Sequence, residues 1–441
     1  MFLTEEELVN NTETKKFSQN VSSSYHLEDR NKNVPKLRFK EYNDEWVEYQ
    51  LGKICKTYSG GTPNVSNLNF YNGLIPFIKS GEIHSNQTAM YITEEGLKNS
   101  SAKLVNKGDL LFALYGATSG EVDISKIDGA INQAILCVKS NYINLIFLKE
   151  ILSFNKNKIL CKYLQGGQGN LSADIFKTLK FKFPTLREQE KIASFLTLID
   201  KKIEKQKELV ELLKKYKRGL LSQIFSQNLR FKDNNGNDYP AWEECRFDEI
   251  FQILGNNTLS RECLNYTNVG VKNIHYGDVL VKYNTCINDK IDQIPNINSD
   301  INLDKISSNN YLKVGDIIMA DTAEDYTVGK TCEIVSCKTK ILSGLHTIPC
   351  RPKQNFAKGY LVYYLNSAEY HDKLIPLITG IKVSSISKKQ IKKTIIKYPI
   401  YGEQEKIANL LLLIENKLNS NIKKLKLFET YKKGLLQQLF I

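Results

Sequence analysis

The sequence repeats itself, and this internal duplication constrains the fold more than any other feature. The tetrapeptide LRFK stands at residues 37–40 and again at residues 229–232, and a tryptophan follows each copy, Trp46 and Trp242. These are the only two tryptophans in the 441-residue chain. A long-range repeat of this kind indicates that one folding unit is present twice.

The two copies differ in length in one region only. Matched residues are 192 positions apart at Leu37 and Leu229 but 215 apart at Pro184 and Pro399, so insertions accumulate between these points. Residues 184–225 then match residues 399–440 without a gap, with EQEKIA in both copies. We therefore expect a globular part whose length varies and an elongated part whose length is fixed.

The fixed-length segments have the pattern of long helices. Both lack internal proline, and their apolar residues recur at spacings of three and four, which is typical of coiled coils. A helix of roughly 35 to 40 residues would be on the order of 55 Å long. One polar residue, Gln206 or Asn421, interrupts each apolar row; it either fixes register and partner or is a tolerated polar residue at a partly exposed position. The expected core of the helix pair is Ile192, Leu196, Ile199, Ile203, Gln206, Val210, Leu213, Ile407, Leu411, Ile414, Leu418, Asn421, Leu425 and Phe428.

The globular parts mix the signals of strands and helices. Short apolar runs such as 110–115 and 317–320 favour strands, whereas residues 142–154 and 359–365 favour helices. We predict an α+β fold with two globular α/β domains joined by two long coiled-coil helices. The expected boundaries are residues 35–183 and 229–398 for the domains and residues 184–228 and 399–441 for the helices. Residues 1–34, rich in polar side chains, are expected to form a disordered extension.

Several enzyme signatures are absent from the sequence. There is no Pro-Pro pair, which the base-holding loop of an amine-methylating DNA methyltransferase requires, and no GxxxxGK[ST] phosphate loop. Asp200-Lys201-Lys202 matches part of a nuclease motif, but it lies within a predicted helix, where charged residues ordinarily fill the solvated face. We expect no catalytic, cofactor-binding or metal-binding residues in this chain.

The charge balance favours a polyanionic partner. The chain has 61 Lys and Arg against 48 Asp and Glu, a net charge of +13, and such an excess most often serves nucleic acid. Apolar runs fall far short of the roughly 18 residues of a membrane span. The start, MFLTEEELVNN, is acidic where a secretory signal is basic. A cytoplasmic location is therefore expected.

Further motifs occur in a fixed order along the chain: LRF…W, SGGTP (59–63), IPFIKSGEI (75–83), GDLL (108–111), GATSG (116–120), INQA (131–134) and the P-x-x-x-EQEKI helix start of both copies. In this order, and with the unit duplicated, the motifs resemble those of the specificity subunit of type I restriction-modification enzymes. The second copy departs from the pattern, because it lacks the GGTP turn and has Leu345-His346 near the place of Asn132-Gln133.

The resemblance implies two target-recognition domains in pseudo-twofold repeat, each recognising one half of a bipartite double-stranded DNA target. The two long helices would pack antiparallel, and two modification subunits would dock beside them, bind S-adenosylmethionine and methylate adenine. Restriction subunits, using ATP and Mg, would translocate and cleave DNA. This chain itself would perform no chemistry and bind no cofactor.

Lysine and serine in loops suit contacts with DNA phosphates, although a merely solvated basic face would look the same in sequence. Two other protein classes stay open: a non-enzymatic coiled-coil adaptor that binds only proteins, and a stand-alone DNA-processing enzyme. Salt-dependent DNA affinity would exclude the first, and the second needs catalytic residues. The residues expected at DNA are Lys79, Ser80, Tyr115, Thr118, Lys162, Gln168, Asn170, Lys272, Asn273, Lys382, Ser384 and Ser385.

Overall fold

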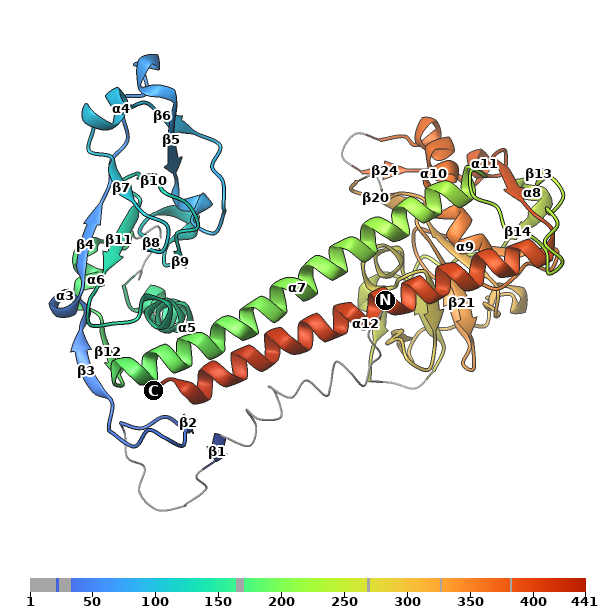
Figure 1. Ribbon diagram of the computed structural model, residues 1–441. Coiled ribbons are helices and arrows are strands. Elements are labelled where there is room, and N and C mark those ends of the chain that lie inside the picture. The colour runs from blue at the N-terminus through green and yellow to red at the C-terminus, as the bar shows by residue number, and fades with distance from the viewer. Residues whose placement is uncertain (1–20, 24–32, 164–169, 268–269, 326, 381–382) are drawn as a thin grey trace. The chain divides into compact units, whose positions relative to one another are not determined.

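The computed structural model describes residues 21–23, 33–163, 170–267, 270–325, 327–380 and 383–441. It divides into two compact units (Figure 1). Unit 1 comprises Met1–Gln206 and Lys424–Ile441, and unit 2 comprises Lys207–Lys423. Each unit contains one globular domain and one end of each long helix, α7 (Leu186–Phe225) and α12 (Tyr401–Leu439).

The long helices begin where the sequence predicts. α7 has 40 residues and α12 has 39, and each starts two residues after a proline, Pro184 or Pro399. The glutamine of the EQE motif closes the turn before the helix. Gln189 Nε2 donates to the carbonyl of Pro184 at 2.9 Å, and Gln404 repeats this bond to Pro399 at 2.8 Å. Both motif copies therefore serve to start a helix at a fixed point.

Within each unit the two helices run antiparallel. In unit 1 the start of α7 shares a hydrophobic core with the end of α12, through Leu196 and Leu435. In unit 2 the end of α7 shares a core with the start of α12, through Phe225 and Ile407. The expected α+β class with paired long helices is confirmed. Of the residues expected between the helices, the buried ones are Ile192, Leu196, Ile203, Gln206, Val210, Ile407, Leu411 and Ile414. The partly buried ones are Ile199, Leu213, Leu418, Asn421, Leu425 and Phe428.

Both domains contain the same central antiparallel sheet. Its middle strands, β8 (Leu110–Ala113) and β19 (Ile317–Ala320), are buried along their whole length, as their uninterrupted apolar sequences predict. In unit 2 a further edge strand, β17 (Cys286–Asn288), pairs parallel with β21. In spatial order the unit 1 sheet is β4 (Lys56–Ser59), β11 (Ile135–Lys139), β8 and β9 (Val122–Ile124). The unit 2 sheet is β14 (Phe251–Ile253), β23 (Thr347–Pro352), β19, β21 (Thr331–Ser336) and β17.

A second sheet in each domain contains one parallel pair. β5 (Tyr71–Ile78) runs parallel with β10 (Gly129–Ile131), and β16 (Lys272–Ile274) runs parallel with β22 (Ile341–Ser343). Parallel strands end at the same edge of a sheet, so the loops that follow them begin side by side. The flanking strands are β6 (Tyr91–Ile92) and β7 (Lys103–Val105) in unit 1 and β15 (Leu264–Asn265) and β18 (Asn296–Ile297) in unit 2.

Small elements complete both domains. β3 (Val47–Gln50) pairs with β12 (Lys180–Phe183), β13 (Glu243–Arg246) pairs in the same way with β25 (Ile395–Tyr398), and unit 2 adds β20 (Thr322–Ala323) with β24 (Ser384–Ser385). The short helices of unit 1 are α3 (Leu51–Ile54), α4 (Glu94–Lys98) and α6 (Ala173–Thr178), beside the longer α5 (Leu145–Tyr163). Those of unit 2 are α8 (Phe247–Ile250), α9 (Tyr360–Leu365), α10 (Ala368–Leu374) and α11 (Lys388–Ile391).

The expected N-terminal extension lies largely outside the described residues. Within it, Val21–Ser23 forms strand β1, which pairs antiparallel with β2 (Leu37–Phe39). The pairing uses an open strand edge of β2. The disorder expected for the extension stays a prediction. Across the described parts of the chain, no helix is both long enough and apolar enough to cross a membrane.

Candidate nucleic-acid interface

Several segments that are distant in sequence meet at one edge of domain 1. The amide of Leu114, just after β8, donates to the carbonyl of Ala134 in the β10–β11 turn at 2.8 Å. The amide of Leu171, just before α6, donates to the carbonyl of Leu114 at 2.9 Å. Because Ile131 of β10 lies beside Ile78 of β5, the loop after β5 starts at the same edge. We call this meeting point of loops the loop junction.

Unit 2 contains the same junction, built from the equivalent segments. The amide of Asp321, just after β19, donates to the carbonyl of His346 in the β22–β23 turn at 3.1 Å. The amide of Ile386, just before α11, donates to the carbonyl of Asp321 at 2.9 Å. The strand pair repeats as well, since Ile274 of β16 lies beside Ser343 of β22. The two domains thus present loops on one backbone pattern with different side chains.

The junction of unit 1 carries polar and aromatic side chains. Thr62 Oγ1 donates to Oε1 of the exposed Gln133 at 2.7 Å, which links the segment after β4 to the β10–β11 turn. The half-buried Tyr115 precedes the 3₁₀ turn η3 (Gly116–Thr118), and Thr118 is also half-buried. Amide and hydroxyl groups such as these can donate to and accept from base edges.

The junction of unit 2 centres on His346. Its backbone is left-handed, with φ +54°, and its side chain is 48% exposed. The ring meets Tyr276 edge-on, with centroids 5.4 Å apart, and Nδ1 lies 3.3 Å from both Asp321 Oδ1 and Thr322 Oγ1. A left-handed conformation is costly for a residue other than glycine, so it persists only where surrounding contacts hold it, often at binding sites.

The edge of this junction combines a neutral histidine with cations. His275 is buried beside Tyr276, and burial, assisted by the positive charge of Arg261, lowers the pKa of His275, so its ring is neutral near pH 7. Lys388 donates to Asn256 Oδ1 at 2.8 Å, and Arg261 is held by Asp278 at 2.9 Å. The described residues contain no cluster of three or more side chains suited to hold a metal ion. The arrangement suits hydrogen bonding and charge recognition.

The structure brings together most of the residues expected at DNA. Lys162 lies near the end of α5, with its Nζ 5.2 Å from the ring centre of Tyr163, and none of the junction hydrogen bonds involves it. Gln168 and Lys382 lie outside the described residues. The residues that belong to the junction segments are Lys79, Ser80, Tyr115, Thr118, Asn170, Ser384 and Ser385.

Two expected residues occupy a different place. Lys272 lies within strand β16, and its Nζ donates to the carbonyl of Asp289 at 3.1 Å. Asn273 is 0% exposed and accepts from Asn257 Nδ2 at 2.7 Å. A completely buried side chain cannot touch DNA in this structure, so the expectation for Asn273 is wrong.

The strand register explains this error. By residue type, Lys272-Asn273 resembles Lys79-Ser80. In the two parallel strand pairs, however, Ile274 of β16 occupies the position that Ile78 occupies in β5. The counterparts of Lys79 and Ser80 are therefore His275 and Tyr276. A local signal was available. Glu82 and Asp278 each accept from the backbone amide three residues earlier, at 3.1 and 3.3 Å.

Sequence reasoning also missed the polar residues of the two turns. Aligning Gly81-Glu82 with Gly277-Asp278 in the two copies would have placed Tyr276 at the position of Ser80. The internal repeat would then have indicated the turns after β10 and β22. The missed residues are Thr62, Gln133, His275, Tyr276, Asp321, Thr322 and His346.

Comparison with known proteins shows what this chain is similar to. The family model "Type I restriction modification DNA specificity domain" matches it twice, over residues 43–214 and 240–427. The type I restriction enzyme MjaVIII specificity subunit of Methanocaldococcus jannaschii is 22% identical over 438 residues, which cover 95% of this chain and 97% of that protein. The EcoR124I/EcoR124II specificity subunit of Escherichia coli is 30% identical over 174 residues, or 37% of this chain and 43% of that protein.

Solved structures share the fold. The S subunit of a type I restriction-modification system from M. genitalium aligns with a TM-score of 0.57 at 16% identity, covering 92% of this chain and 99% of that one. A chain from a structural study of complex assembly and conformational transition in a type I system aligns at 0.54 and 16% identity, covering 90% and 97%. Because the family model matches once in each domain and covers most of the sequence, the chain belongs to the type I restriction-modification DNA specificity family, as a specificity subunit with two target-recognition domains.

Proposed function

We propose that this subunit selects the target of a type I restriction-modification complex by recognising a bipartite DNA sequence, with one domain at each half-site, and that it performs no chemistry itself. The loop junction carries this proposal. The same backbone hydrogen bonds occur in both domains, at 2.8 and 2.9 Å in one and at 3.1 and 2.9 Å in the other. The side chains they present differ, which is what two recognition surfaces for two different half-sites require.

The chemistry of each junction suits a DNA groove. Gln133 carries an amide that can donate and accept together, the pattern that pairs with adenine in the major groove. His346 and Tyr276 offer a ring edge and a hydroxyl in the second domain. Lysines such as Lys79 and Lys388 supply positive charge for phosphates, which position a protein on DNA without identifying the sequence.

The long helices support a second part of the proposal, that they set the number of base pairs between the half-sites. α7 is one uninterrupted helix of 40 residues, which corresponds to about 60 Å at about 1.5 Å per residue. One turn of DNA measures about 34 to 36 Å, so a helix of this length is longer than one turn and could hold two domains at half-sites in different turns of the groove. The gap-free correspondence of α7 with α12 fits segments whose length is under constraint.

Exposed apolar residues on the helices support docking of two equivalent partner subunits. Leu198, Leu212 and Tyr216 of α7 are exposed, and so are the residues at the matching positions of α12, Leu413, Leu427 and Tyr431. Exposed apolar side chains repeated on a helix pair favour two like interfaces. We infer that the partners are two modification subunits, with restriction subunits in the full complex. S-adenosylmethionine, Mg and ATP then belong to those partners, and the assembly acts on DNA in the cytoplasm.

A coiled-coil adaptor that binds proteins only is the alternative. The paired helices alone would serve either role, but an adaptor has no need for two junctions rich in hydrogen-bonding groups. DNA affinity separates the two functions. A specificity subunit bound to its modification subunits binds one bipartite duplex tightly, and its affinity falls as salt rises because counterions are released from the phosphates. An adaptor shows no such dependence.

Paired substitutions test the division of labour between the domains. His346→Asn suits the left-handed backbone, since asparagine tolerates it, and replaces the ring. Gln133→Ala removes the amide in the first domain, and Gln354→Ala serves as an exposed control. Methylome sequencing of DNA modified by each variant with its modification subunits should show one relaxed half-site for His346→Asn and the other for Gln133→Ala. The proposal would be overturned if one variant relaxed both half-sites, or if the two variants left both half-sites unchanged.

A further inference from the structure

The two long helices are joined by an ion pair that occurs twice. In unit 2 Lys217 of α7 lies 3.2 Å from Glu415 of α12, and in unit 1 Lys432 of α12 lies 2.6 Å from Asp200 of α7. In the gap-free match Lys217 corresponds to Lys432 and Asp200 corresponds to Glu415. The same pair is therefore made at both ends of the helix pair, with the helices exchanged.

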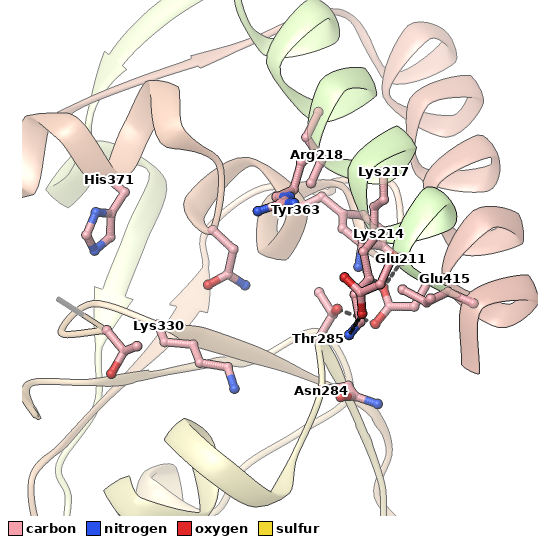
Figure 2. A pocket seen from close by; sticks show the side chains of 14 residues that line it. Glu211, Lys214, Lys217, Arg218, Asn284, Thr285, Lys330, Tyr363, His371 and Glu415 are labelled. Carbon is pink, nitrogen blue, oxygen red and sulfur yellow. Dashed lines mark hydrogen bonds and ion pairs between the residues drawn. The ribbon is translucent and has the colours of Figure 1, made fainter. Parts of the chain in front are cut away.

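In unit 2 the pair reaches into the recognition domain. Glu415 is 7% exposed and accepts from the hydroxyls of Thr285 at 2.6 Å and Tyr363 at 2.7 Å. Figure 2 shows these side chains converging on Glu415 at one wall of a hollow of about 640 Å³. Thr285 precedes β17 and Tyr363 belongs to α9, so the domain contacts the helix pair through two separate segments.

The environment keeps Glu415 ionised. Burial alone would raise its pKa, but the charge of Lys217 and the hydroxyls of Thr285 and Tyr363 outweigh burial and hold the pKa below its usual value. Lys217 Nζ also lies 5.7 Å from the ring centre of Tyr363. One carboxylate thus holds a helix and two domain segments together.

In unit 1 the equivalent pair reaches its domain through charges. Lys432 also lies 3.0 Å from Glu150 of α5, a residue only 2% exposed. Lys149 lies 2.7 Å from Glu150 and 3.6 Å from Asp200. Four charged groups from α5, α7 and α12 therefore form one cluster. The domain and both helices meet in it.

Stability alone does not explain these clusters. Taking charges out of water is costly, and a packed apolar side chain often stabilises a protein as well as a buried ion pair does. Lys217 and Lys432 stand in the heptad row that is otherwise apolar, at the place where a leucine would hold the helices together. What the charged clusters add is directionality, because hydrogen bonds and ion pairs fix distances and angles that apolar contacts leave loose.

We propose that these two clusters are positioning groups that fix how each recognition domain is seated on the helix pair, and so restrict the accepted target to one spacer length. The clusters are Lys149, Glu150, Asp200 and Lys432 in unit 1 and Lys217, Thr285, Tyr363 and Glu415 in unit 2. The inference rests on the proposed recognition of two half-sites. One base pair adds about 3.4 Å and about 35° of rotation between the half-sites. A shift of one domain on the helix pair by that amount would therefore allow a spacer one base pair longer or shorter.

The test uses the complex with modification subunits and duplexes that carry identical half-sites. Three spacers are compared: the wild-type length, one base pair shorter and one base pair longer. Glu415→Gln and Lys432→Met each remove one charge at nearly constant size, and Lys432→Arg restores the charge. The preference of methylation rate for the wild-type spacer should fall roughly tenfold in the first two variants and return in the third.

Further variants protect the test against loss of folding. Thr285→Val and Tyr363→Phe remove single hydroxyls without touching the helix-to-helix ion pair, and both should lower the spacer preference to a smaller degree. Glu211→Gln removes an exposed pair with Lys214 on α7, at 2.7 Å, and should leave the preference unchanged. Equal loss of rate on all three spacers, or an unchanged preference throughout, would overturn the inference. Failure of the wild-type complex to need both half-sites would instead refute the proposed function.

Discussion

Arg38 donates from Nε and Nη2 to the two carboxylate oxygens of Glu188, at 2.8 and 2.7 Å, and Glu188 is completely buried. Arg230 and Glu403 repeat this bidentate pair at 3.1 and 2.6 Å. The arginine of LRF in each copy thus holds the first glutamate of EQE at the start of a long helix. This relationship explains why the two motifs recur together although they are far apart in sequence.

Removing one partner of this pair should destabilise unit 1. Arg38→Met leaves the buried carboxylate of Glu188 without its cation, and we expect a loss of about 3 kcal/mol because an uncompensated buried charge is costly. Calorimetry of the purified chain measures the change. Replacing the charge at an exposed pair, Lys214→Met, should cost less than about 0.5 kcal/mol. A similarly small effect of Arg38→Met would show that the pair with Glu188 does not stabilise unit 1.

The length of the helices should set the spacer. Inserting four residues after Gln206 adds about one helical turn, or about 6 Å, which corresponds to one or two base pairs at about 3.4 Å each. Four residues also shift the heptad register, so some stability should be lost. Methylome sequencing of DNA from the variant complex should show unchanged half-sites with a longer spacer. An unchanged spacer in an active complex would refute the proposal that the length of the helices sets the spacer.

The overall fold could be predicted because its signals are local. Heptad spacing and buried apolar strands are visible within a few residues of sequence, and the duplication shows where one unit ends and the next begins. The site depends instead on pairing between distant segments. Asn273 is misplaced because the position of β16 relative to β22 decides which residues leave the sheet, and the similarity of Lys272-Asn273 to Lys79-Ser80 outweighed the weaker match of Gly81-Glu82 with Gly277-Asp278.

Asp200 illustrates the same limit. Its sequence context predicts a solvated helix face, yet Lys432, 232 positions away, lies 2.6 Å from it. Antiparallel pairing of α7 with α12 brings the two residues together. The heptad pattern predicts that the helices pair, but the polar contacts between them follow only from the orientation and register of the pair.

A histidine in unit 1 should make stability depend on pH. His84 Nδ1 lies 2.9 Å from Asp123 Oδ2, and Nε2 lies 3.4 Å from Glu121 Oε2. The hydrogen bond to Asp123 raises the pKa of His84 above 6.5, against the opposing effect of burial. A raised pKa means that this stabilisation is complete below pH 6.5 and is lost as pH rises through the higher pKa of the folded state.

His84→Gln isolates this contribution, because glutamine cannot carry the charge. The melting temperature of the wild-type chain should exceed that of the variant most clearly at about pH 6, and the gap should shrink by about pH 8. Parallel thermal melts at the two pH values measure the gap. A difference that does not change with pH would show that the charged form of His84 contributes nothing.

Exchange of one domain tests whether each domain recognises its own half of the target. Residues 49–183 are replaced by the corresponding domain of a related specificity subunit, while both long helices are retained. Methylome sequencing of cells that carry the hybrid with its modification subunits gives the recognised sequence. One half-site should change, while the other half-site and the spacer should stay the same. A change in both half-sites together would refute the division of recognition between the domains.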